Sequence, residues 1–382
     1  MAFTPAVPHL PENTAYSWPV PRELVHKAAH TEVLLTGWRQ CGEGEFEVGA
    51  QWPRDHGFWR TDADGVQDPM LLVETTRQVL PLIAHMGFGV PVGHQLIWGH
   101  YHCAFSVPFL PVAGSPAEVL LRLSASRSPE HGARLRQIAL TMTVRCADRV
   151  LATVSTVYSA HSPRVYARLR GPDTPAPPEA MTAAVLPPPP LAPSLVGRES
   201  EREVVLAAAE DGGGNDGGVG APGAEARGKA EGGVALEHGG AGVQGAPSDA
   251  AVGGSWSRRQ LRVLTTSPWL FDHPVDHVPG MLLMEAARQA VHLAAGPLRP
   301  RLTRLDAGFH HYVDLDVPSW VETSPGPPAA ADAEPLRGER TLSVDITQRG
   351  EKAFTAVVGF VTDEKADSAW EAGATAPPAG LR

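Results

Sequence analysis

The sequence predicts an α+β protein made of two copies of one unit, and three observations lead to this prediction. Residues 68–79 match residues 279–290 at a constant offset of 211, as from Met70 to Met281. Each of these stretches has apolar residues at helical spacing and follows a pair of β-rich runs. Strand-like runs come after each predicted helix. Two copies this far apart indicate a duplicated domain rather than a solenoid.

A β-hairpin is predicted at the start of each copy. In the first copy, β-rich residues 31–36 and 45–50 flank a glycine-rich turn. In the second copy, residues 203–206 and 260–265 are separated by a stretch dominated by Gly, Ala and acidic residues. We place that stretch as an insertion in the hairpin loop, because the entropic cost of loop closure grows slowly with length.

The repeated stretch itself predicts a long helix in each copy, over about residues 71–85 and 281–295. Pro69 and Pro279 suit the first turn of a helix. Pro81 lies inside the first helix and is expected to kink it.

The strands after each helix complete the predicted unit. Residues 99–102 match residues 310–313 at the same offset of 211 and predict one strand per copy. A hairpin follows in each copy, with turns at Ala147-Asp148 and at Arg349-Gly350. The order is β-β-α-β-β-β, which fits an antiparallel sheet wrapped around one long helix. This is the hot-dog arrangement, and one chain here supplies a tandem, or double, hot-dog.

The chain is therefore divided into four parts. Residues 20–170 form the first hot-dog, and residues 171–194 form a proline-rich linker that is expected to be stiff and extended. Residues 195–365 form the second hot-dog, with an insertion at about 210–255 that is expected to be disordered. Residues 366–382 are expected to form a loose tail.

Composition and charge narrow the class of protein. The net charge of −10 argues against nucleic-acid binding, and a hydrophobic content of 43% is typical of a globular chain. Three cysteines cannot form a disulfide framework, so a reducing cytoplasm is expected. No signal peptide, membrane span or membrane partner is expected, because the chain has no long apolar run. Because both hot-dog halves lie in one chain, a monomer is sufficient to form the complete double hot-dog.

An Asp-His pair precedes each predicted helix, as Asp55-His56 and Asp272-His273. The helices then carry Glu, Arg and Gln at the same spacing in both copies. These polar groups on apolar helices are the candidate site. No phosphate-binding glycine motif precedes a helix, so no cofactor is expected, and His94, His100 and His102 lack the ligand spacing of a zinc site. No metal is therefore expected either.

Residues 271–289 resemble two families. The spacing from Pro279-Gly280 to Glu285 and Gln289 is similar to that of the 3-hydroxyacyl carrier-protein dehydratases. A closer resemblance is to the A-factor biosynthesis (AfsA-type) family of γ-butyrolactone synthases. Its signature is similar to Phe-Asp-His-Pro-Val-Asp-His-Val-Pro-Gly-Met-Leu-Leu-Met-Glu-Ala-Ala-Arg-Gln-Ala at 271–290 and to the phrases at 48–54 and 89–95.

The resemblance implies an acyltransferase. Such an enzyme joins a β-ketoacyl group from acyl carrier protein to the hydroxyl of dihydroxyacetone phosphate, on the way to a γ-butyrolactone-type or furan-type signal that controls secondary metabolism. The alternatives are a hydroxyacyl-thioester dehydratase and a non-catalytic protein that binds acyl thioesters or regulates through them. Carrier protein and dihydroxyacetone phosphate are the expected partners.

Roles for the candidate residues follow from the chemistry of ester formation. The predicted catalytic residues are Glu285, His273, Glu74 and His56. Glu285 is expected to have a raised pKa and to act as acid or base, and His273 either to deprotonate the hydroxyl or to orient the acyl carbonyl. The predicted substrate-binding residues are Arg288, Gln289, Arg77, Gln78, Arg54, Asp272 and Gly280. Arg288 and Arg77 are expected on the phosphate, and the helix N-terminus at Gly280 offers free N–H groups.

Several alternatives stay open at this point. Glu285 and Arg288 are also spaced as an ordinary i,i+3 pair on a helix face. Either half could be the working one, and His56 could face Glu285 while His273 faces Glu74. Asp276 and His277 are expected to cap the second helix, with orientation of His273 as the alternative. The basic cluster Arg299, Arg301 and Arg304 is a candidate docking site for an acidic carrier protein or simply a solvated loop.

Overall fold

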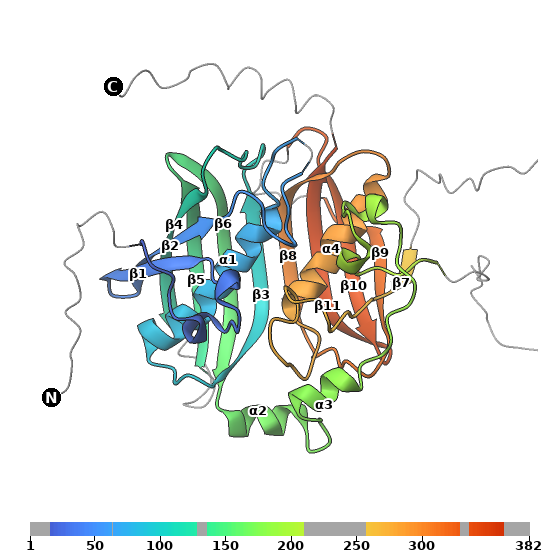
Figure 1. Cartoon of the computed structure of the whole chain (residues 1–382), viewed down its shortest axis with the longest axis horizontal. Helices are drawn as coiled ribbons and strands as arrows, with labels where there is room; N and C mark the ends of the chain where they lie inside the picture. The colour runs from blue at the N-terminus through green and yellow to red at the C-terminus, as the bar shows by residue number, and fades with distance from the viewer. Residues whose placement is uncertain (1–15, 63, 128–135, 210–256, 329–335, 363–382) are drawn as a thin grey trace, which may run out of the picture.

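The computed structural model describes residues 16–62, 64–127, 136–209, 257–328 and 336–362. Its centre is one antiparallel sheet of eleven strands, in the order β1-β2-β4-β5-β6-β3-β8-β11-β10-β9-β7. Figure 1 shows the two long helices, α1 and α4, in front of this sheet. The halves are joined where β3 pairs with β8, for example His100 with Gly308. This confirms the predicted double hot-dog.

The bounds of the elements are as follows. The first copy contains β1 (Leu35–Gly42), β2 (Glu45–Trp52), α1 (Pro69–Leu82), β3 (Gln95–Phe105), β4 (Ala117–Arg127), β5 (Arg136–Cys146) and β6 (Arg149–His161). Two short helices follow, α2 (Pro163–Arg170) and α3 (Pro177–Thr182). The second copy contains β7 (Ser257–Gln260), α4 (Gly280–Ala295), β8 (Arg301–Phe309), β9 (Ser319–Pro325), β10 (Arg340–Gln348) and β11 (Glu351–Val361).

Each copy has one strand more after its helix than the sequence predicts. The additional strands are β4 and β9. In β4, Val119, Leu121 and Leu123 are buried while the residues between them are more exposed, which is the period-2 pattern of a half-buried strand. The predicted match of residues 310–313 with the strand at 99–102 is wrong, because β8 ends at Phe309. The turns at Ala147-Asp148 and Arg349-Gly350 are confirmed, and each joins two paired strands.

The two long helices are buried almost all round, as expected for a helix wrapped by a sheet. Asp68 caps α1 by accepting a hydrogen bond from the backbone N–H of Met70 at 2.9 Å, and Pro69 occupies the first turn. Regular α-helical geometry ends at Leu82, one residue after Pro81, and a π-turn over Ile83–Gly87 follows. A polar side chain on either helix is therefore enclosed and must find partners within the protein.

The start of α4 differs from that of α1. Its N-cap is Pro279, and no side chain caps it. The predicted capping role of Asp276 is wrong, because this carboxylate accepts hydrogen bonds from Tyr166 and Arg170 instead. Asp276 thus ties α2, which follows the first copy, to the loop before α4.

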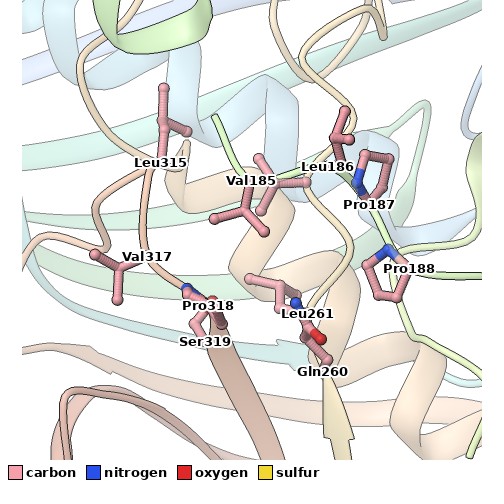
Figure 2. A pocket seen from close by; sticks show the side chains of 11 residues that line it. Val185, Leu186, Pro187, Pro188, Gln260, Leu261, Leu315, Val317, Pro318 and Ser319 are labelled. Carbon is pink, nitrogen blue, oxygen red and sulfur yellow. The ribbon is translucent and has the colours of Figure 1, made fainter. Parts of the chain in front are cut away.

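The linker between the copies is less uniform than predicted. Part of residues 171–194 forms the helix α3, and the rest runs along the second copy, where Val185 donates to the backbone of Leu315. Figure 2 shows the small cavity at this contact, which is lined by Val185, Pro188, Leu261 and other residues of the linker and second copy. Its volume of about 10 Å³ has room for roughly one water molecule, so it is too small for a substrate.

The predicted disordered insertion at about 210–255 and the loose tail at 366–382 lie outside the described residues. On either side of the insertion, Leu206 and Leu261 form an antiparallel bridge, and the N–H of Ala207 donates to the carbonyl of Gln260. The two segments flanking the insertion are therefore neighbours, as in a hairpin.

Replacing Gly57 by alanine is expected to weaken the packing between the copies. The loop after β2 lies against the second copy here, and an added Cβ would come within 2.6 Å of Nε1 of Trp269. Such overpacking lowers the free energy of unfolding by about 1–3 kcal/mol. Urea unfolding measures the change, with Gly114→Ala as the control because a Cβ there meets nothing within 4 Å. Equal unfolding midpoints for the two variants would contradict this account.

Candidate active site

Each long helix presents one buried carboxylate inside a cluster of polar residues. We call Lys27, Glu74, Arg77 and Gln78 the first cluster, and Arg198, Glu285, Arg288 and Gln289 the second cluster. Glu74 is 2% exposed and Glu285 is fully buried. Each carboxylate therefore depends on the cations around it to remain ionised.

In the first cluster, two cations hold Glu74. Arg77 donates to both carboxylate oxygens at 2.8 Å, through Nε and Nη2, and Nζ of Lys27 lies 3.0 Å from Oε1. Burial alone would raise the pKa of Glu74, but the charges of Arg77 and Lys27 outweigh it and hold the pKa well below its usual range. Glu74 is thus an anion that fixes two cations in place.

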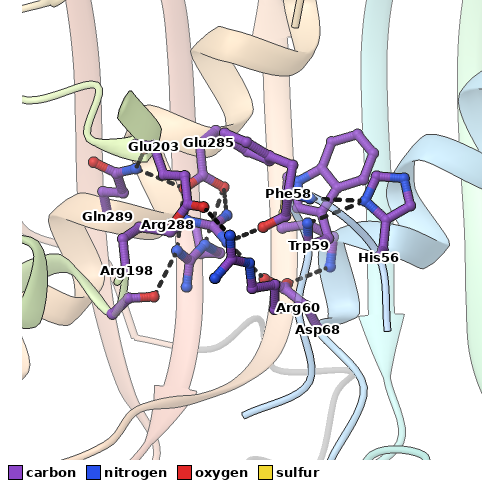
Figure 3. A network of polar contacts seen from close by, with 12 residues as sticks. His56, Phe58, Trp59, Arg60, Asp68, Arg198, Glu203, Glu285, Arg288 and Gln289 are labelled. Carbon is purple, nitrogen blue, oxygen red and sulfur yellow. Dashed lines mark hydrogen bonds and ion pairs between the residues drawn. The ribbon is translucent and has the colours of Figure 1, made fainter. Parts of the chain in front are cut away.

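The second cluster repeats this arrangement with arginine in place of lysine (Figure 3). Arg198 contacts both oxygens of Glu285, at 2.9 and 2.7 Å, and Arg288 donates to both at 3.0 and 3.1 Å. Burial opposes ionisation here too, yet the charges of Arg198 and Arg288 lower the pKa of Glu285 to about 2. The predicted raised pKa of Glu285 is therefore wrong, and the geometry gives no support for its use as an acid or base near neutral pH.

The glutamines have the same structural contacts in both copies. Gln78 accepts from the N–H of Leu34 and donates to the carbonyl of Glu32, and Gln289 makes the equivalent pair of bonds to Val205 and Glu203. Each glutamine also donates to the glutamate one turn before it. These contacts engage the amide groups of both glutamines within the protein. The predicted role of Gln78 and Gln289 in substrate binding stays a prediction.

Lys27 and Arg198 are the members of the clusters that the sequence reasoning missed. Both follow a short 3₁₀ turn, over Arg22–Val25 and Pro193–Val196 respectively. Leu24-Val25-His26-Lys27 resembles Leu195-Val196-Gly197-Arg198, and this similarity is the signal that could have found them. Its offset is 171 rather than 211, because the loops before the two helices differ in length.

The loop of the second copy reaches the first cluster. The carboxylate of Asp272 accepts hydrogen bonds from the backbone N–H groups of Ala28 and Ala29, which follow Lys27. Nδ1 of His273 lies 3.4 Å from Asp272 Oδ2, and the side chain of His273 is 46% exposed. Burial tends to raise the pKa of Asp272, but hydrogen bonds from His273 and from the two amides lower it to about 2. An anionic Asp272 thus orients a solvent-accessible imidazole.

The loop of the first copy reaches the second cluster in a different way. The carbonyl oxygen of Phe58 accepts from Arg198 at 2.7 Å, and Asp68 lies 3.5 Å from the same guanidinium (Figure 3). His56 does not face Glu285. Its Nδ1 accepts from the N–H groups of Phe58 and Trp59, and its Nε2 lies 3.6 Å from Glu32. His56 is 5% exposed, so both of its nitrogens are engaged inside the protein.

The two clusters therefore differ in what they can still bind. Arg288 donates to Glu285, to His292 and to the carbonyl of Val196, and its side chain is 6% exposed. Arg77 is 21% exposed, and within the described residues its donors engage Glu74 alone, which leaves Nη1 available. The first cluster is open to a ligand, whereas the second is closed by its own contacts.

The remaining predicted site residues lie apart from the open cluster. The side chain of Arg54 is exposed to solvent, and its carbonyl accepts from Thr61. At Gly280, an added Cβ would lie 3.1 Å from Phe309 and 3.3 Å from Trp98, so the start of α4 rests against these two stacked rings. Their predicted roles in substrate binding stay predictions.

The predicted basic docking cluster is partly neutralised. Arg299 and Arg301 lie 3.0 and 3.4 Å from Asp64, which belongs to the first copy. Among the described residues, no group of three or more His, Cys, Asp and Glu side chains is arranged to hold a metal ion. None of the helices in the described ranges is both long and apolar enough to cross a membrane.

The fold and the clusters define a double hot-dog protein with a polar site between the helix of one copy and a loop of the other. The chain belongs to the family of the A-factor biosynthesis hotdog domain (AfsA), whose sequence model matches residues 10–162 and 254–361. The unmatched residues between these ranges contain the linker, the insertion and Arg198.

Curated relatives match along nearly the whole chain. One is a 2-oxo-3-(phosphooxy)propyl 3-oxoalkanoate synthase from Streptomyces virginiae, 37% identical over 341 residues that cover 89% of this chain and 97% of that protein. A synthase of the same name from Streptomyces coelicolor is 31% identical, covering 88% of this chain and 93% of that protein. Among solved structures, the 12:0-ACP thioesterase from Umbellularia californica is 8% identical with a TM-score of 0.43, covering 85% of this chain and all (100%) of that one.

Proposed function

We propose that this chain is an acyltransferase that joins a 3-oxoacyl group to a phosphorylated three-carbon acceptor. The observation that carries the proposal is the open first cluster, where Lys27 and Arg77 lie beside the Asp272-His273 pair of the other copy. The name of the relatives describes an ester between a 3-oxoalkanoate and a 2-oxo-3-(phosphooxy)propyl group. The ester would be the precursor of a γ-butyrolactone-type or furan-type signal.

The substrates that fit this reaction are a β-ketoacyl thioester of acyl carrier protein and dihydroxyacetone phosphate. The acceptor carries a dianionic phosphate at one end and a single hydroxyl at the other. Nη1 of Arg77 suits the phosphate, since a guanidinium forms charge-assisted hydrogen bonds to phosphate oxygens. The ammonium of Lys27, whose side chain is 5% exposed, adds its positive charge from inside the protein. Glu74 contributes by keeping these two cations in a fixed geometry.

The transfer requires two groups that handle protons. The oxygen of the hydroxyl attacks the thioester carbon, the O–H proton passes to a base, and the C–O bond forms as an oxyanion develops. The C–S bond then breaks, and the sulfur leaves as a thiol after taking a proton. The net reaction is alcohol plus thioester giving ester plus thiol.

His273 suits the task of giving a proton to the leaving sulfur. Asp272 lies next to Nδ1 of His273, so Nε2 is the nitrogen left for the substrate, and the protonated ring donates from it. In this role His273 donates a hydrogen bond to the carbonyl oxygen of the thioester and then a proton to the leaving sulfur. This corresponds to the predicted role of orienting the acyl carbonyl.

A dehydratase is the alternative enzyme, and the electrostatics favour it less. Loss of water from a hydroxyacyl thioester needs an acid to protonate the departing hydroxyl. Glu74 and Glu285 are both held ionised by paired cations, so neither is suited to that role.

Incubation with a 3-oxoacyl carrier protein and dihydroxyacetone phosphate tests the proposed function. The expected product is a phosphorylated keto ester, detected by mass spectrometry together with free carrier-protein thiol. A 2-enoyl product from a 3-hydroxyacyl thioester would identify a dehydratase instead. Binding of the acylated carrier protein without turnover of either substrate would identify a binding protein.

A further inference from the structure

The backbone of His26 is in a conformation that favours glycine. Its φ and ψ are 52° and 51°, in the left-handed region. The other non-glycine residues with positive φ in the described ranges, Ala147 and Arg349, sit in tight turns of hairpins. A side chain with a Cβ is strained in this region, and a retained strain of this kind is often associated with function.

The equivalent residue of the second copy is a glycine. Gly197 follows the same 3₁₀ turn and has φ and ψ of 63° and 40°. A Cβ on Gly197 would collide with the ring of His292, so no side chain fits there. The two halves therefore share a backbone that suits glycine, and only the open site carries an imidazole on it.

The hydrogen bonds of His26 fix which of its nitrogens is a free acceptor. Nδ1 of His85 lies 2.7 Å from the carbonyl oxygen of Val90, which can only accept, so this nitrogen carries the proton. In the neutral ring, Nε2 of His85 is then an acceptor, and it lies 3.0 Å from Nε2 of His26. His26 must donate from Nε2, which leaves Nδ1 with a free lone pair.

The ring of His26 lies near the open first cluster. His26 directly precedes Lys27, and the charges of both Arg77 and His273 act on its ring. Its Nδ1 has no hydrogen-bond partner and is not among the buried unpaired atoms of the described residues, so it faces accessible space. Burial, together with the charges of His85 and Arg77, lowers the pKa of His26 to about 3, so the ring is neutral and any proton that it takes up must pass on to a neighbouring group.

We propose that His26 is the residue that takes the proton from the hydroxyl of the acceptor, with His85 as its relay. The hydroxyl binds to Nδ1 of His26 while Lys27 and Arg77 hold the phosphate. As the C–O bond forms, the O–H proton passes to Nδ1, and the proton on Nε2 of His26 passes to Nε2 of His85. The positive charge then rests on His85, whose Nδ1–H remains bonded to Val90.

The proton count balances over one turnover. His273 gives a proton to the leaving sulfur, and the His26–His85 pair holds the proton from the hydroxyl. Return of that proton from His26 to His273 after the products leave restores both histidines. No oxidant, reductant or additional reactant is required. This inference rests on the proposed function, because it assigns a base for that same transfer.

Replacing His26 by glycine tests the proposal without adding strain. Glycine is the residue that the second copy uses at this backbone conformation, so the variant is expected to unfold at a denaturant concentration equal to or above that of the wild type. Its kcat for ester formation should fall about 100-fold or more, because a general base is lost. Ala147→Gly, which relieves the same backbone strain in the turn between β5 and β6, should leave kcat unchanged.

His85→Gln is the second variant. The amide oxygen of glutamine can still accept from Nε2 of His26, but it cannot take up a proton at neutral pH. We expect kcat to fall about 10-fold or more while the KM for dihydroxyacetone phosphate stays within about twofold. Turnover by the wild type together with unchanged kcat in His26→Gly would overturn the role of His26 alone. Absence of ester formation by the wild type would overturn the proposed function and this inference with it.

Discussion

Replacing His273 by glutamine is expected to lower kcat for ester formation about 100- to 10,000-fold, which is the range for loss of a group that transfers protons. His273 is the exposed imidazole at the open first cluster, and Asp272 orients it through Nδ1. Glutamine keeps a polar side chain of similar reach but cannot carry a proton. Steady-state kinetics with a 3-oxoacyl carrier protein and dihydroxyacetone phosphate measure the effect.

The matched comparison is His56→Gln, at the equivalent position of the first copy. His56 is enclosed and bonded to the backbone of its own loop, so its loss should reduce stability but leave kcat per folded molecule within about threefold. His310→Gln controls for removal of an exposed histidine. The ring of His310 is exposed and contacts Thr355, which belongs to neither cluster. If His56→Gln abolished turnover while His273→Gln did not, the working site would be the second cluster.

Replacing Arg198 by methionine is expected to lower the free energy of unfolding by about 3–5 kcal/mol, the usual result of removing one partner from a buried ion pair. The side chain of Arg198 is 3% exposed and contacts both oxygens of the fully buried Glu285. It also bonds to Phe58 of the other copy, so its loss removes a contact between the halves. Guanidinium unfolding followed by circular dichroism gives the difference.

Arg39→Met is the control for this effect. Arg39 is 62% exposed and pairs with Glu47, which keeps a second cation, Arg122, when Arg39 is removed. Loss of an exposed arginine whose partner is still paired costs only about 0–1 kcal/mol, because water and salt screen its charge. If Arg198→Met were no more destabilising than Arg39→Met, the second cluster would not be the structural contact that its burial indicates.

The repeated helices were predictable because their signal is local. Met70 to Gln78 recurs from Met281 to Gln289 without a gap, and each stretch lies within one helix. The helix and the buried glutamate therefore follow directly from the sequence. Strand β4 carries an equally clear alternation at Val119, Leu121 and Leu123, so the sequence also contains the signal for this strand, which the predicted order lacks.

The electrostatics of the site could not be predicted in the same way. Glu285 gains its second cation from Arg198, which lies 87 residues earlier in the chain, and the sequence gives no measure of that distance in space. Without this partner, an isolated carboxyl on an apolar helix is expected to have a raised pKa, and with it the pKa falls. The preference of His273 for the first cluster depends likewise on how the copies pack, through the amides of Ala28 and Ala29.

The pairing of β3 with β8 inside a single polypeptide has an evolutionary consequence. In a homodimer of one hot-dog unit, symmetry imposes every mutation on both sites at once. A gene that encodes both units is free of this constraint, so His26 can arise in one half while Gly197 persists in the other. One of the two duplicated sites can then specialise for catalysis while the other stabilises the fold, and selection acts on each of them separately.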